Sequence, residues 1–179
     1  MNLESGGNQT TNRRRPEVAF HLDLMKEYPA RLHHAVPEWV KSGAVFHVRG
    51  RCERGNTVDL TKPEVAKALL ESVSFYQTKQ RWHVTLFVLM PDHWHALISF
   101  PQEDAMIRVV GDWKRYQEKQ HGIHWQEGFF DHRIRNDAEL DEKAYYIRMN
   151  PVRAELCAEM NQWAWRLEQV DGDLRAPAV

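Results

Sequence analysis

Two histidines separated by a single residue are the sharpest chemical feature of the sequence. His93 and His95 flank Trp94 within the run MPDHWHALISF. In a β-strand, residues i and i+2 point to the same face, so both imidazoles would project side by side. Two imidazoles in that arrangement have the right type and separation to bind one divalent metal ion. Two ordinary polar residues on a solvated strand face remain the alternative on this pair alone.

A tyrosine and an asparagine four residues apart, Tyr146 and Asn150, form a second candidate pair. Residues at this spacing occupy one side of adjacent helical turns. Tyr146 lies beside the apolar stripe of its predicted helix and could present its hydroxyl to a cleft, with Asn150 offering an amide oxygen as a ligand. The alternative is that Tyr145 and Tyr146 are packing aromatics at the rim of the core. The apolar stripe itself consists of Leu140, Ala144 and Ile147.

Positive charge gathers near these residues although the whole chain is nearly neutral. It contains 24 Lys and Arg against 25 Asp and Glu, a formal charge of −1, so the overall charge does not favour a nucleic-acid partner. Local clusters can still hold a phosphate backbone, or they can be ordinary solvated surface. The clusters contain Lys114, Arg115, His132, Arg133, Arg135, Arg148 and Arg153.

Composition excludes several classes of protein. No apolar run approaches the roughly 18 residues that span a bilayer, and residues 1–16 lack the apolar core of a secretory signal. Cys52 and Cys157 form no CxxC pattern, which argues against a disulfide scaffold or a structural zinc site and is typical of a reducing cytoplasm. The ten histidines and seven tryptophans suggest metal ligands and rings that could stack on bases.

The elements that must position these residues alternate between strands and helices. Thr61 and Glu64 predict a capping box at the start of the first helix. The third helix should end before Asn150-Pro151, because proline disfavours helix in the residue before it. Periodicity predicts strands at 43–49, 82–90 and 93–100, and helices from residue 61, at 103–120 and at 138–149.

The order of these elements predicts an α+β sandwich of ferredoxin-like kind, with a central antiparallel sheet and helices packed on it. In the first strand, Val45, His47 and Arg49 should face one way. We expect three parts of the chain: a basic, flexible arm at 1–28, a folded domain at 29–160, and a partly packed tail at 161–179.

Three segments together resemble one protein family. MPDHWHALISF, WQEGFFDHRIR and YIRMNPVRAEL stand in the order found in the REP-associated tyrosine transposases, a branch of the single-tyrosine HUH transposase superfamily. HUH denotes two histidines around a hydrophobic residue, and REP denotes a repetitive extragenic palindrome. The resemblance runs from near Arg31 to about Leu156 and implies a fold of the HUH endonuclease type.

The resemblance also implies roles for individual residues. His93 and His95 match the pair that holds a divalent cation, Mg²⁺ or Mn²⁺, and Asn150 matches the residue that completes the site. Tyr146 matches the nucleophile, which would cleave single-stranded DNA hairpins through a 5′-phosphotyrosine. We expect DNA contacts from Arg133, Arg135, Lys114, Arg115, Arg148 and Arg153.

Two other functions remain as alternatives. The first is a domesticated DNA-hairpin-binding protein that has lost turnover, and the second is a metal-dependent phosphodiesterase that uses water in place of Tyr146. The near-zero charge and Phe129-Phe130, where relatives often carry a tyrosine, depart from the family pattern. The resemblance further implies a monomer rather than a homodimer, without a membrane partner, in the bacterial cytoplasm and at the nucleoid when bound to DNA.

Overall fold

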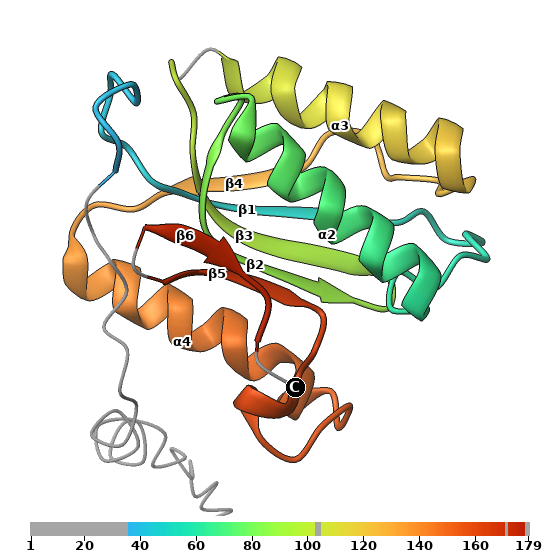
Figure 1. Cartoon of the computed structure of the whole chain (residues 1–179). Coiled ribbons are helices and arrows are strands. Elements are labelled where there is room, and N and C mark those ends of the chain that lie inside the picture. The colour runs from blue at the N-terminus through green and yellow to red at the C-terminus, as the bar shows by residue number, and fades with distance from the viewer. Residues whose placement is uncertain (1–35, 103–104, 171, 178–179) are drawn as a thin grey trace, which may run out of the picture. The chain divides into compact units, whose positions relative to one another are not determined.

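One antiparallel sheet organises the part of the chain that the structure, a computed structural model, describes (Figure 1). The predicted arm at 1–28, the first residues of the predicted domain at 29–35 and the predicted helix start at 103–104 lie outside the described residues. The described residues are 36–102, 105–170 and 172–177.

The strands of this sheet follow the order β4-β1-β3-β2-β5-β6, and every pair is antiparallel. The predicted α+β fold class is therefore confirmed. The tail supplies β5 and β6, so the sheet continues beyond residue 160. The strands are β1 (Phe46–Arg51), β2 (His83–Met90), β3 (His93–Ser99), β4 (Phe130–Arg133), β5 (Arg166–Val170) and β6 (Asp173–Arg175).

Strand β1 begins and ends later than the periodicity predicted. It continues through Gly50 and Arg51, which pair with Trp94 and His93 of β3. Gly50 is required there because a Cβ atom would lie 2.5 Å from Nε1 of Trp94. In the sequence, Gly50 suggests the end of a strand. In the structure, the strand continues and Gly50 is the residue at which its backbone passes close to a buried indole ring.

Three helices cover the sheet within the described residues. Helices α2 (Pro63–Thr78) and α3 (Ala105–His121) lie on one face, and α4 (Asp137–Arg153) lies on the other (Figure 1). The predicted capping box of α2 is wrong, because Lys62 is the N-cap and makes no side-chain cap. The Thr61 hydroxyl donates instead to Oδ1 of Asp59 at 2.6 Å.

The prediction that the third helix ends before Asn150-Pro151 is also wrong, since α4 continues to Arg153. Pro151 has no N–H to donate to the carbonyl of Ile147. Nδ2 of Asn150 donates to the carbonyl oxygens of Tyr146, at 2.9 Å, and Ile147, at 3.4 Å. The asparagine side chain thus supplies the donor that the proline removes, and the helix continues past Pro151.

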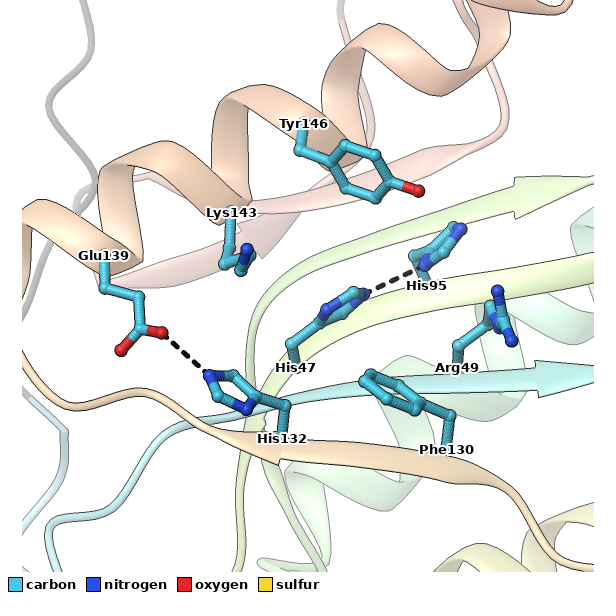
Figure 2. A pocket seen from close by; sticks show the side chains of 8 residues that line it. All are labelled: His47, Arg49, His95, Phe130, His132, Glu139, Lys143 and Tyr146. Atoms are coloured by element: carbon cyan, nitrogen blue, oxygen red, sulfur yellow. Dashed lines mark hydrogen bonds and ion pairs between the residues drawn. The ribbon is translucent and has the colours of Figure 1, made fainter.

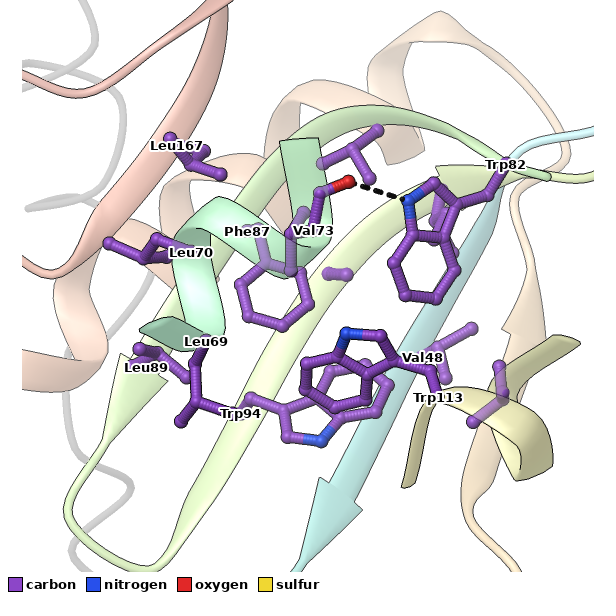
Figure 3. Close-up of a cluster of buried hydrophobic side chains, with 14 of the residues drawn as sticks. Val48, Leu69, Leu70, Val73, Trp82, Phe87, Leu89, Trp94, Trp113 and Leu167 are labelled. Atoms are coloured by element: carbon purple, nitrogen blue, oxygen red, sulfur yellow. Dashed lines mark hydrogen bonds between the residues drawn. The ribbon is translucent and has the colours of Figure 1, made fainter. Parts of the chain in front are cut away.

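The core between the sheet and helices α2 and α3 is built from tryptophans. Trp94 stacks on Phe87 with ring centroids 5.2 Å apart, and Trp113 meets Trp94 edge-on at 5.5 Å (Figure 3). Nε1 of Trp82 donates to the carbonyl of Val73 at 3.1 Å. Five of the seven tryptophans are buried, so they serve packing rather than base stacking: Trp82, Trp94, Trp113, Trp125 and Trp163.

Candidate active site

The register of the sheet places chemically active side chains in two rows on the face that α4 covers. Arg49 of β1 lies opposite His95 of β3 on one side and Phe130 of β4 on the other. Two residues earlier in β1, His47 lies opposite His132. Directly opposed residues share a face, so β1, β3 and β4 together present a polar surface.

Helix α4 leaves this polar surface open because it packs on the apolar half of the same face. Its predicted stripe of Leu140, Ala144 and Ile147 is buried, as expected. The stripe packs against residues of β2 and β3, namely Leu86, Val88, Met90 and Leu97.

A cavity of about 390 Å³ remains between the polar side of α4 and the polar half of the sheet. Figure 2 shows its lining residues, which come from β1, β3, β4 and α4. They are His47, Arg49, His95, Phe130, His132, Glu139, Lys143 and Tyr146.

The two histidines of the HxH pair lie side by side, with ring centroids 5.0 Å apart. Nδ1 of His93 contacts Oδ1 of Asp92 at 2.6 Å, and Asp92 also accepts a hydrogen bond from Arg51. Nδ1 of His95 lies 3.0 Å from Nε2 of His47. Each ring is therefore oriented through Nδ1, which leaves Nε2 as the nitrogen for a metal ion, the usual arrangement for ligating histidines.

Burial keeps the central imidazoles neutral. It lowers the pKa of His95 to about 2, and the charges of His93, His47 and Arg49 act in the same direction. Burial also lowers the pKa of His47 to about 4, assisted by the positive charges of Lys143 and Arg49. Neutral imidazole is the form that binds metal, so near pH 7 His95 is ready to act as a ligand without losing a proton.

The predicted ligand set fits a divalent metal chemically. The bonds from Nδ2 of Asn150 to the helix carbonyls leave Oδ1 as the free end of its side chain, so the set offers two imidazole nitrogens and one amide oxygen. Such mixed ligands favour Mn²⁺ in affinity over Mg²⁺. The described residues contain no group of three or more His, Cys, Asp or Glu that could hold a metal ion.

Tyr146 lies beside two of the histidines that line the cavity. Its ring centroid is 5.9 Å from that of His95 and 6.2 Å from that of His47, edge-on to both. The guanidinium of Arg153 lies 5.8 Å from the centre of the Tyr146 ring. With 38% of its surface exposed, Tyr146 is held by its neighbours and still reachable by a substrate.

The predicted DNA contacts separate into three groups. Arg153 lies against Tyr146. Arg133 of β4 lies opposite Phe46, on the face of the sheet away from the cavity, and Arg135 follows the end of β4. Arg148 forms an ion pair with Glu168 of β5, and both side chains are largely buried. Its charge is therefore already compensated within the fold.

Lys114 and Arg115 belong to α3, which covers the opposite face of the sheet from Tyr146 (Figure 1). A DNA contact requires an exposed side chain, but Lys114 belongs to the buried face of its helix. Its ammonium is buried and donates to the carbonyl oxygens of Gln126, at 2.7 Å, and Gly128. Lys114 thus anchors the segment that leads into β4, and Arg115 pairs with Asp112.

Sequence reasoning missed His47, Arg49, Glu139 and Lys143 as lining residues. The first two alternate on one face of a predicted strand, which was the available signal. Glu139 and Lys143 precede Tyr146 by seven and three residues, so a helical projection places all three on one side of α4.

Comparisons with known proteins agree with this geometry. Residues 45–150 match the family described as "Transposase IS200 like", which is more than half of the chain and includes all four predicted catalytic and metal-ligating residues. The chain belongs to this family. The family-level resemblance predicted from the sequence is therefore confirmed. No curated protein matches the chain.

Two solved structures are similar to this member of the family. One is the structure of a REP-associated tyrosine transposase bound to a REP hairpin, with 20% identity and a TM-score of 0.60, covering 69% of this chain and 75% of that one. It supports the fold. The other, from Deinococcus radiodurans R1 and described as a candidate transposase, has 18% identity and a TM-score of 0.42, covering 57% and 87%.

Proposed function

We propose that this member of the IS200-like transposase family cleaves and rejoins single-stranded DNA hairpins through Tyr146. One observation carries the proposal: the exposed Tyr146 lies 5.9 Å, ring centre to ring centre, from His95, at the mouth of a cavity large enough for a small ligand. A tyrosine hydroxyl next to imidazoles that can hold a metal ion is an arrangement that supports nucleophilic attack on a phosphodiester.

The reaction follows from the chemistry of these groups. Oη of Tyr146 attacks the scissile phosphorus, the bond to O3′ breaks, and the phenolic proton leaves as O3′ takes up a proton. The products are a 5′-phosphotyrosine and a free 3′-OH. Because the covalent link retains the phosphodiester, the 3′-OH of another strand can attack it and release Tyr146, so joining needs no ATP.

His93, His95 and Asn150 would hold a divalent cation, Mg²⁺ or Mn²⁺, and that ion would polarise the phosphate and offset its developing charge. The residues that orient His93 and His95, namely Asp92 and His47, support this role. Arg153, beside the Tyr146 ring, would contact the same phosphate. Arg133 and Arg135 remain proposed contacts to the flanking DNA backbone.

The substrate we propose is a hairpin of a repetitive extragenic palindrome, supported by the solved transposase that is bound to a REP hairpin. We further propose that the protein acts as a monomer in the bacterial cytoplasm and associates with the nucleoid through DNA. Within the described residues, no helix combines the length and apolar character needed to cross a membrane.

A covalent-adduct assay tests the nucleophile. Purified protein, Mn²⁺ and hairpins made from the host's own palindromic repeats are incubated and resolved on a denaturing gel. The label is at the 3′ end, because the tyrosine would retain the 3′ fragment. We expect a labelled protein band that disappears in Tyr146→Phe and persists in the matched control Tyr145→Phe.

Two outcomes would favour the alternatives. If the wild-type protein cleaves DNA without a labelled protein band, and Tyr146→Phe cleaves at the wild-type rate, water is the nucleophile and the protein is a phosphodiesterase. If the wild-type protein binds the hairpin tightly but gives neither product nor band with Mg²⁺ or Mn²⁺, it is a hairpin-binding protein without turnover.

A further inference from the structure

Phe130 is an exposed aromatic side chain at the rim of the cavity. It lies on β4, an outer strand of the sheet, and 48% of its surface is accessible. Its ring meets His47 edge-on at 5.7 Å, and the guanidinium of Arg49 lies 5.7 Å from the ring centre. Figure 2 shows Phe130, Arg49 and Tyr146 around the same opening. Single exposed apolar residues are common on protein surfaces, but this one lines the cavity beside Tyr146, where a ligand would meet its ring.

We propose that Phe130 and Arg49 form a stacking platform for one unpaired base of the DNA strand, next to the phosphate that Tyr146 attacks. This inference rests on the proposed function and specifies one contact of its substrate. A nucleobase has an apolar π-face that stacks on an aromatic ring, and every base offers such a face. The platform would therefore hold the strand in position without selecting its sequence.

The charges around the cavity suit a nucleotide better than an apolar ligand. Arg49 and Lys143 are cations that line it together with Phe130. His132 and Glu139 contact each other across the far end at 2.7 Å, so the one carboxylate among the lining residues is already engaged. A nucleotide brings one negative phosphate with each base, so the ring and the two cations match both of its parts.

A second exposed phenylalanine offers a comparison with nearly the same local chemistry. Phe75 of α2 is 58% exposed, and Nζ of Lys79 lies 5.5 Å from its ring centre. It lines a different and larger cavity, on the side of the sheet away from Tyr146. Phe75 shares with Phe130 an exposed ring and a neighbouring cation but lies away from Tyr146, so Phe75→Ala is the matched control.

Binding measurements with abasic DNA test the platform. The proteins carry Tyr146→Phe and no metal is added, so no strand is cut. The probe is a fluorescent REP hairpin with single-stranded flanks, and a series of probes each lack one base of those flanks. Dissociation constants for every probe are measured with the protein that retains Phe130 and with Phe130→Ala. At each flank position, the side-chain change and the removal of the base form a double-mutant cycle.

We expect Phe130→Ala to weaken binding of the intact hairpin between about fivefold and a hundredfold, the range for loss of one stacked base. At one flank position, the protein that retains Phe130 should bind the abasic probe as weakly as Phe130→Ala binds the intact hairpin. With that probe, Phe130→Ala should cause no further loss of affinity. Phe130→Trp should retain binding, whereas Phe130→Leu, which keeps an apolar side chain without a π-face, should lose it. Phe75→Ala should leave every constant unchanged.

The inference is overturned if the losses from Phe130→Ala and from base removal add at every position, or if Phe130→Leu binds like wild type. Either result would leave the covalent chemistry of Tyr146 intact. Conversely, the coupling could be found at one position while the protein with Tyr146 intact forms no covalent adduct. That result would support the platform and overturn the proposed function. Equal melting temperatures of the variants without DNA would exclude a loss of folded protein as the cause.

Discussion

The two faces of the central sheet are built from the same strands and yet have opposite characters. The face under α2 and α3 holds a continuous apolar core around Trp82, Trp94 and Trp113. The face under α4 is apolar on β2 and at Leu97 of β3, and it is polar on β1, β4 and the part of β3 that holds His93 and His95. The difference teaches that one face of this sheet supplies stability, which permits the other to keep polar groups beside an open cavity.

The run His93-Trp94-His95 shows this division within three residues. Trp94 is fully buried between Phe87 and Trp113 on the first face. The histidines on either side point to the second face, where neither contributes to the apolar core. Substitutions on alternate residues should therefore separate folding from chemistry.

The largest expected effect is on the polar face. His95→Ala should abolish cleavage and the covalent adduct, because the proposed metal site loses a ligand, while hairpin binding stays within a few-fold of wild type. Gel assays and fluorescence anisotropy on the same preparation measure both quantities. His124→Ala, which changes an exposed histidine, is the control. If binding fell in proportion to activity, His95 would be a DNA contact and the division between the faces would be misplaced.

Next in size is a substitution on the apolar face. Trp94→Ala should lower the free energy of unfolding by about 3–5 kcal/mol, because it removes a large ring from a packed core. Trp94→Phe should cost clearly less, since Nε1 of Trp94 has no hydrogen-bond partner to lose. Urea denaturation followed by circular dichroism measures both. A loss below 1 kcal/mol for Trp94→Ala would contradict the idea that this face supplies the stability of the fold.

A smaller effect is expected where His47 orients His95. His47→Phe removes the partner at 3.0 Å from Nδ1 of His95 while keeping an aromatic ring in the same space. Loss of such an outer partner typically weakens metal binding by about 10- to 100-fold. Titration calorimetry with Mn²⁺ in the absence of DNA measures the affinity directly. Unchanged affinity together with an unchanged melting temperature would remove His47 from the support of the metal site.

The smallest effect is the share of acid sensitivity that a single histidine contributes. His47 and His95 have an ordinary pKa of 6.5 when unfolded, against about 4 and about 2 in the folded chain, so between these values the unfolded state binds more protons. Stability is then highest above pH 6.5 and falls as the pH drops below it, by up to about 1.4 kcal/mol per pH unit for each histidine. Urea unfolding at pH 7, 6 and 5 measures this slope, which His47→Phe should reduce. An equal slope in both proteins would contradict it.

Local periodicity was sufficient to predict which residues of a single strand or helix lie on the same face. Alternation in a strand placed His93 and His95 on one face, and helical spacing placed Tyr146 beside the buried stripe of α4. These inferences succeed because the repeat of a strand or helix is set by the backbone and needs no knowledge of neighbours. The same alternation correctly paired His47 with Arg49 on one side of β1.

What failed depends on particular side-chain contacts, some of them between distant segments. Proline was expected to end α4, but the side chain of the preceding residue, Asn150, donates to the carbonyl of Ile147, which Pro151 leaves without its usual donor. Lys114 was expected at the surface, but carbonyls from the segment before β4 receive its ammonium. The predicted DNA contact of Arg148 stays a prediction, although Glu168 of β5 already pairs with its guanidinium. The partners of Lys114 and Arg148 come from other segments, so no pattern within their own helices reveals them.

The sequence by itself determined the chemical groups, their order and the faces on which the histidines and the tyrosine stand. Only the tertiary structure decided that His47, 48 residues before His95, supports it, and that Phe130 and Lys143 line the same cavity. The physical reason is that strand order and register bring side chains together across the sheet. They follow from packing of the whole chain rather than from the period of any one segment.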